Sequence, residues 1–218
     1  MKTKKALLLA CLAILAMLSA CTNNNNEKVG TGEGSSDIPM SIGTWDGKSF
    51  ENKWSNIAFS LPDNWSIASR EEVESIMGIG SEIMVNDGIY TQTQIDLSSV
   101  RTAYDFYIYN DLNANIILLY ENLAFPGLSS ITQEQYFDEV KSQLEKLETL
   151  EYEFVENGYM EIAGEEYYYG TFTVQGGFMA QTYYIRKYDK AIISFITTYT
   201  EANFDSVEEL FNRMEPAN

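Results

Sequence analysis

The side chains that most often carry catalysis are scarce in this chain. The sequence has 218 residues, no histidine and two cysteines, Cys11 and Cys21. A Ser-His-Asp triad or a Cys-His pair therefore cannot form, and the common zinc sites, which draw on cysteine and histidine, are also excluded. What remains for catalysis is carboxylate pairs, tyrosines, lysines and a Ser-Lys pair.

Acidic residues form three short clusters that could supply paired carboxylates, at residues 71–74, 165–166 and 208–209. A glycosidase needs two carboxylates held about 5 to 9 Å apart across a cleft. These clusters stand at expected helix starts or strand ends, where acidic residues favour the helix dipole or are simply solvated. We therefore predict that the protein is not an enzyme and has no metal site and no cofactor, and we keep a carboxylate hydrolase as a weaker alternative.

Two tyrosines are the best candidates for ligand contacts. In the expected strand 167–175, alternation would turn Tyr168 and Phe172 inward and Tyr167 and Tyr169 outward, beside threonines. An outward tyrosine offers an apolar ring and a hydroxyl, which suits a peptide or a glycan. The alternative is that a helix covers this face of the sheet as well.

The N-terminal residues carry the most specific pattern of the chain. Three lysines precede the apolar run 6–17, and Leu18-Ser19-Ala20-Cys21 follows. The run is shorter than the roughly 20 residues that span a bilayer, so the layout is typical of an export signal. Residues 18–21 resemble the lipobox of bacterial lipoproteins, which implies removal of residues 1–20 and lipidation of the Cys21 sulfur. The alternative is a secreted protein with a chance cysteine at this position.

The resemblance implies a protein held by acyl chains on Cys21 (a palmitate-type anchor) at the extracytoplasmic face of the cell membrane. Residues 21–39 are rich in Asn, Gly and Ser, which predicts a flexible linker, and residues 40–218 suit one domain. Asp and Glu number 32 against 14 Lys and Arg, a net charge of −18. This charge excludes nucleic acid as a partner and leaves the acyl chains, not the protein surface, to hold the membrane.

The strand patterns predict an α+β fold. Residues 115–123 and 191–199 are apolar on both faces, so a layer must cover each face of their sheet. Apolar stripes at helical spacing occur in residues 132–147 and 204–214. A shorter helix is expected from Ser69 to the glycines at 78 and 80, with mixed loop and short helix over 81–100. We predict an antiparallel β-sheet meander flanked by helices on both faces.

This order of elements, with the turn Leu61-Pro62-Asp63-Asn64-Trp65, resembles the PsbP-like α-β-α sandwich. The stretch Gly43-Thr44-Trp45-Asp46-Gly47 is similar to one in uncharacterised small lipoproteins of gut Gram-positive bacteria. The resemblance covers about residues 40–218 and implies no catalytic residues. We therefore predict a non-enzymatic binding or assembly domain with a protein, peptide or glycan partner. The alternative is a solute- or glycan-binding lipoprotein associated with a transporter, although such proteins usually close two lobes around a ligand.

Overall fold

A seven-stranded antiparallel sheet organises the protein. The computed structural model describes residues 40–124 and 128–218, so the expected signal 1–20, the linker 21–39 and Cys21 lie outside the described residues. Neighbouring strands in the sheet follow the order β4-β5-β6-β10-β9-β8-β7. The strands are β4 (Trp65–Ile67), β5 (Thr102–Asn110), β6 (Asn115–Asn122), β7 (Tyr152–Ile162), β8 (Glu165–Val174), β9 (Met179–Tyr188) and β10 (Ala191–Tyr199).

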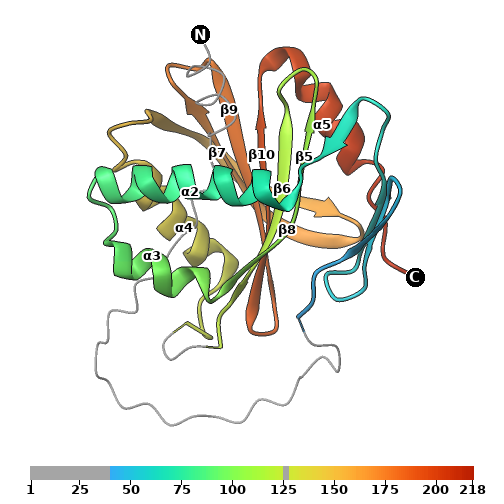
Figure 1. The fold of residues 1–218 in the computed structure, drawn as a ribbon, viewed down its shortest axis with the longest axis horizontal. Coiled ribbons are helices and arrows are strands. Elements are labelled where there is room, and N and C mark those ends of the chain that lie inside the picture. The colour runs from blue at the N-terminus through green and yellow to red at the C-terminus, as the bar shows by residue number, and fades with distance from the viewer. Residues whose placement is uncertain (1–39, 125–127) are drawn as a thin grey trace.

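Three helices cover one face of this sheet (Figure 1). They are α2 (Arg70–Asn86), α3 (Gln92–Ser99) and α4 (Gln133–Leu144). The first and third begin with capping boxes, in which Ser69 and Thr132 exchange hydrogen bonds with Glu72 and Gln135. Capping fixes where each helix starts, and the apolar stripe of each helix then decides which side turns to the sheet.

The opposite face is shared between a helix and a second, smaller sheet. Strands β1 (Thr44–Asp46), β2 (Ser49–Asn52) and β3 (Ile57–Ser60) form that small sheet, and η1 (Glu201–Asn203) leads into α5 (Phe204–Phe211). Both faces of the central strands are thereby buried, as their apolar character required. The predicted α+β class, with an antiparallel sheet between helices on both faces, is confirmed.

The expected end of α2 is wrong. We predicted that the helix would stop at Gly78 and Gly80, but it continues to Asn86. The last two turns place Ile83 and Met84 in the core. Burying these two side chains is worth about 1.5–3 kcal/mol each, which exceeds the roughly 1 kcal/mol cost of each glycine inside a helix.

Candidate ligand-binding site

The structure separates the two tyrosines that the sequence singled out. Strand β8 alternates as expected, because Tyr168 and Phe172 belong to the core under the helices and Tyr167 to the core on the opposite face. Tyr167 is nevertheless 0% exposed, so the prediction that it faces solvent is wrong. Its ring lies 5.7 Å from that of Phe195. The alternative stated above is correct for this position, since other elements cover this face of the sheet.

Tyr169 lies at the border of the covered area. Its side chain is half-buried, and its ring lies across the neighbouring strand at Gly158. A Cβ atom on Gly158 would meet Tyr169 Cε1 at 3.0 Å, so the glycine makes room for the ring. Tyr169 therefore marks the point at which the face of the sheet begins to open. Neither tyrosine forms the ligand platform that the sequence alone indicated.

A cleft opens on the same face of the sheet, beyond the cover of α5. It has a volume of about 460 Å³, and we call it the Tyr199 cleft. Three aromatic residues give it its character: Tyr199 at the end of β10, Phe204 at the start of α5, and Phe178 in the β8–β9 connection. The exposed fraction is 58% for Phe178 and 40% for Phe204. The wall also includes Thr173, Ala180, Glu201 and Asp205.

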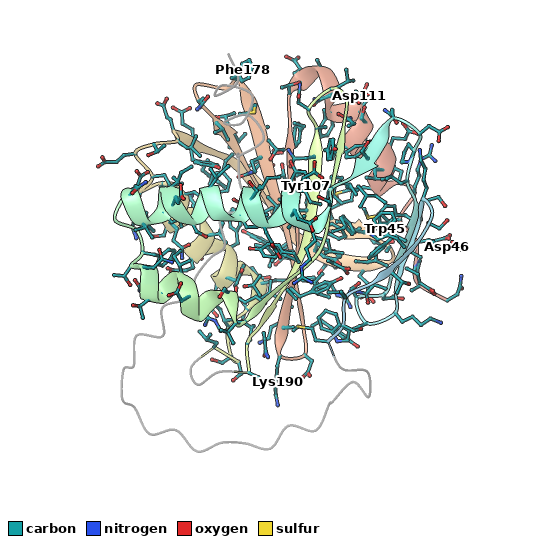
Figure 2. The ribbon with its side chains drawn as sticks, viewed as in Figure 1. Trp45, Asp46, Tyr107, Asp111, Phe178 and Lys190 are labelled. Carbon is teal, nitrogen blue, oxygen red and sulfur yellow. The ribbon has the colours of Figure 1, made fainter. Side chains whose placement is uncertain are left out.

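The β8–β9 connection shapes the cleft. Pairing ends at Val174 and Met179, so residues 175–178 form the connection. Gln175, Gly176 and Gly177 all have positive φ values, which the two glycines adopt without strain. As a result Phe178 leaves the strand. Figure 2 shows it at one end of the long strands, with Lys190 at the other.

Threonine and tyrosine hydroxyls form a row across three strands at the edge of the Tyr199 cleft. Thr171 Oγ1 lies 2.9 Å from Thr182 Oγ1, which lies 3.0 Å from the Tyr199 hydroxyl. The Tyr199 ring packs on that of Phe204 with centroids 5.1 Å apart. Hydrogen bond and ring contact together hold Tyr199 in one orientation, so this wall of the cleft is formed before any ligand arrives.

The electrostatics of the Tyr199 cleft favour binding over catalysis. Burial raises the pKa of Tyr199, and the nearby Glu156 charge raises it further. The hydrogen bonds with Thr182 and Thr171 lower this pKa, but by less than burial raises it. Its hydroxyl therefore stays protonated near neutral pH and is neither a base nor an activated nucleophile. The acidic residues Glu201 and Asp205 are exposed at the rim. Aromatic rings beside carboxylates suit a cationic group on a ligand.

Most members of the three acidic clusters have structural partners. Glu72 caps α2, Glu74 pairs with Arg70 at 3.0 Å, and Glu209 pairs with Arg213 at 2.6 Å. In the middle cluster, Glu165 Oε2 lies 3.2 Å from Arg186 Nη2. Among residues 40–124 and 128–218, no cluster of three metal-binding side chains occurs.

Two carboxylates inside the fold were missed at the sequence level, one partly buried (Asp105) and one fully buried (Glu121). Asp105 accepts hydrogen bonds from Asn52 and from the Tyr120 hydroxyl, and Glu121 accepts one from the Tyr136 hydroxyl at 2.8 Å. A lone acid inside an apolar strand was a usable signal for Glu121. The two carboxylates lie on opposite faces of the sheet, because Tyr120 and Tyr136 belong to different cores. They do not face each other across a cleft, so this pair does not form the arrangement that a glycosidase requires.

The described residues contain no helix that is long and apolar enough to cross a membrane.

Comparisons with known proteins concern the fold. No family model and no curated protein matches the sequence. The cyanobacterial PsbP protein CyanoP from Synechocystis sp. PCC 6803 is similar over 84% of this chain and 98% of its own, at 10% identity and a TM-score of 0.47. A Bacteroides thetaiotaomicron protein is similar over 79% of this chain and 49% of its own, at 12% identity and a TM-score of 0.41.

LpqN, described as involved in cell envelope biogenesis of Mycobacterium tuberculosis, is similar over 74% of this chain and 83% of its own. Its identity is 12% and its TM-score 0.39. We transfer no function from any of the three. The α+β class of this chain rests on its own strands and helices.

Proposed function

We propose that the protein is a lipid-anchored, non-enzymatic binding domain at the extracytoplasmic face of the cell membrane. The observation that carries the binding role is the Tyr199 cleft, where Phe178 and Phe204 stay exposed beside Glu201 and Asp205. Large exposed apolar side chains grouped in a concave site, with a few polar groups around them, are typical of a ligand site.

The anchor rests on residues 18–21. Leucine, two small residues and a cysteine follow an apolar run, and lipidation of the Cys21 sulfur would fix the chain to the membrane. One acyl chain holds a protein only marginally, whereas two or three hold it firmly. At about 5–6 Å times the square root of its length, a linker over residues 21–39 would have a reach of about 25 Å. The domain could then turn its cleft toward a partner above the membrane.

Replacing the anchor cysteine tests this part of the proposal. We expect Cys21→Ser to move the protein from the detergent phase to the aqueous phase in a phase-partition experiment and to abolish incorporation of radiolabelled palmitate. Cys11→Ser is the matched control, because Cys11 belongs to the apolar run that is expected to be removed. A Cys21→Ser protein that still partitions with detergent and still carries palmitate would contradict the anchor.

The ligand class follows from the chemistry of the Tyr199 cleft. The rings of Phe204 and Phe178 offer apolar area, and the two rim carboxylates, together with a net charge of −18, attract a cation. We therefore expect a protein partner that presents a basic side chain. A glycan is the second candidate, because the hydroxyl row from Thr171 to Tyr199 could bond sugar hydroxyls at the edge of the same rings.

Titration with short probes separates these two candidates. We expect the peptide Gly-Arg-Gly-Arg-Gly to shift the NMR signals of residues 199–205, and its Glu counterpart to leave them unchanged. Phe204→Ser should weaken binding by about two- to fivefold, since a cation–π contact at an exposed site contributes about 0.5–1 kcal/mol. Val100→Ser, at a more exposed apolar residue outside the cleft, is the control.

Binding of chitotetraose, with loss of that binding on Phe204→Ser, would instead support the glycan. Absence of binding by both probes, or loss of binding equally in the Val100→Ser control, would contradict the cleft as the ligand site.

A further inference from the structure

A second groove lies along the outer edge of β5, away from the Tyr199 cleft. Its volume is about 500 Å³. One side is formed by Ile42, Trp45 and Ile67, the other by the first turns of α2, and the floor by residues 102–107 of β5. Figure 2 shows Tyr107 beside α2 and Trp45 toward the small sheet. The groove therefore joins elements that are far apart in the sequence.

The floor of this β5-edge groove is a strand edge that β4 leaves uncovered. Strand β4 has three residues and pairs only with Ile108, Tyr109 and Asn110. The last contact is the hydrogen bond from Ala68 N to Tyr107 O, at 2.9 Å. Among the described strands none pairs with the outer edge of β5 beyond this point. Such an edge is a template for another strand.

Backbone groups of Tyr104 point into the groove. On the inner edge, Asn122 N donates to Arg101 O at 2.9 Å, so Arg101 faces β6. Neighbouring residues of a strand send their N–H and C=O groups to opposite edges, which turns those of Tyr104 outward. The outer edge thus offers the N–H and C=O groups of Tyr104 where the groove is open.

A β-bulge at Asp105 gives the edge a fixed shape. The pairing with β6 shifts between Tyr104 and Phe106, and Asp105 is the extra residue. Its carboxylate accepts hydrogen bonds from Gly43 N at 2.7 Å and Asn52 Nδ2 at 2.8 Å, as well as from Tyr120. These bonds tie β5 to the chain around the small sheet, so the groove does not need to form on binding.

The opposite edge of the sheet, formed by β7, is protected against strand addition, whereas the edge of β5 is not. Edge strand β7 carries three exposed acidic residues, Glu153, Glu156 and Glu161, which discourage strand addition. Residues 102–107 of β5 include one charged residue, Asp105, and its carboxylate is occupied by the bonds just described. The apolar walls are exposed instead, by 61% at Ile42 and 38% at Ile67.

We propose that the β5-edge groove binds an extended segment of another polypeptide, which adds as a strand to β5 and places apolar side chains against Ile42 and Ile67. Main-chain hydrogen bonds supply affinity in this mode, and side-chain pockets supply selectivity. Basic residues at the ends of the segment complement the net charge of −18. In the groove wall itself, Arg70 and Glu74 pair with each other at 3.0 Å, so neither sign of charge dominates there.

The test titrates the full-length protein in detergent with the peptide Lys-Val-Thr-Val-Thr-Val-Lys. We expect saturable binding, a shift of the Tyr104 amide signal and slower hydrogen exchange there. N-methylation of alternate residues along one peptide edge should weaken binding at least about fivefold, the effect of one lost hydrogen bond of about 1 kcal/mol. Tyr104→Pro, compared with Tyr104→Ala, should abolish binding, because proline removes the outward N–H.

A surface pair keeps the result interpretable if the proline variant does not fold. Ile42→Lys should lower affinity about tenfold, because it places a charge in an apolar wall facing a basic peptide. Val155→Lys should leave the affinity unchanged, because Val155 has a similar exposed fraction but lies in β7, at the other edge of the sheet. The proposal would be overturned if Val155→Lys lowered the affinity and Ile42→Lys did not, or if the N-methylated peptide bound as tightly as the unmodified one. So would self-association of the protein that Ile42→Lys abolishes, since a second copy would then occupy the edge.

Phe204→Ser should leave the shift and the slower exchange of the Tyr104 amide unchanged, because the Tyr199 cleft and the β5-edge groove share no lining residue. Failure at one site is therefore distinguishable from failure at the other.

Discussion

Gly170→Ala is expected to lower the free energy of unfolding by about 3 kcal/mol, at the upper end of the usual cost of overpacking a core. Gly170 lies in β8 directly under α4, and a Cβ atom there would stand 2.0 Å from Phe137 Cζ. The Phe137 ring is fully buried and packs against Tyr168 and Phe172, so it cannot move aside cheaply. Urea denaturation followed by circular dichroism measures the change.

A double-mutant cycle identifies the cause. In a Phe137→Leu background, where the ring is absent, Gly170→Ala should cost less than half as much as in the natural protein. Gly158→Ala is a matched strand control, because its Cβ would meet the half-exposed Tyr169 ring at 3.0 Å and that ring has room to shift. Equal costs at positions 158 and 170, or an unchanged cost in the Phe137→Leu background, would refute the packing explanation.

The second large effect is a dependence of stability on pH at Glu121. This side chain is 1% exposed, and burial raises the pKa of its carboxyl to about 7, against the lowering effects of the Tyr136 hydroxyl and Arg101. Below about pH 4.5 the residue is protonated in both states. Between about pH 4.5 and 7 the unfolded chain loses the proton and the folded chain keeps it, so stability falls as pH rises.

The magnitude follows from the shift. One pKa unit corresponds to about 1.4 kcal/mol, so a rise from 4.5 to about 7 amounts to about 3 kcal/mol. We expect Glu121→Gln to gain about this much in unfolding free energy relative to the natural protein between about pH 4.5 and 8, because the amide cannot ionise. Urea titrations of the variant and the natural protein at about pH 4.5 and at about pH 8 measure this gain. Comparing the two proteins at each pH cancels most contributions from the other carboxylates.

Glu161→Gln removes one exposed charge and is the control for the change in net charge. A Glu121→Gln difference that is the same at both pH values, or that reverses sign, would show that the ion pair with Arg101 outweighs burial. The 3.5 Å distance between Arg101 Nη2 and Glu121 Oε1 argues for burial as the larger effect.

Local patterns predicted the elements of this protein well because their causes are local. The two capping boxes at Ser69 and Thr132 begin helices as expected. The apolar faces of β6 and β10 required two covering layers, and both are present. The end of α2 was misjudged, since Ile83 and Met84 extend it past Gly80 by joining a core whose other residues are mostly distant in the sequence.

The candidate sites could not be predicted in the same way. The Tyr199 cleft combines the β8–β9 connection, the end of β10 and the start of α5, and the β5-edge groove combines Ile42 with residues 67–74 and 102–107. No spacing along the chain records these neighbours. Tyr167 shows the difficulty most clearly: its alternation was predicted correctly, but its exposure depends on whether other elements dock over it.

By itself the sequence excluded histidine- and cysteine-based catalytic sites and predicted the α+β class, because residue types and periodicity can be read along the chain. Its resemblance to a lipobox also implies the expected anchor at Cys21, which stays a prediction. Only the tertiary structure decided which aromatic residues stay accessible, which carboxylates are buried and which strand edge is left open. These depend on how the small sheet and α5 share one face of the large sheet, and long-range packing of that kind leaves no local signature.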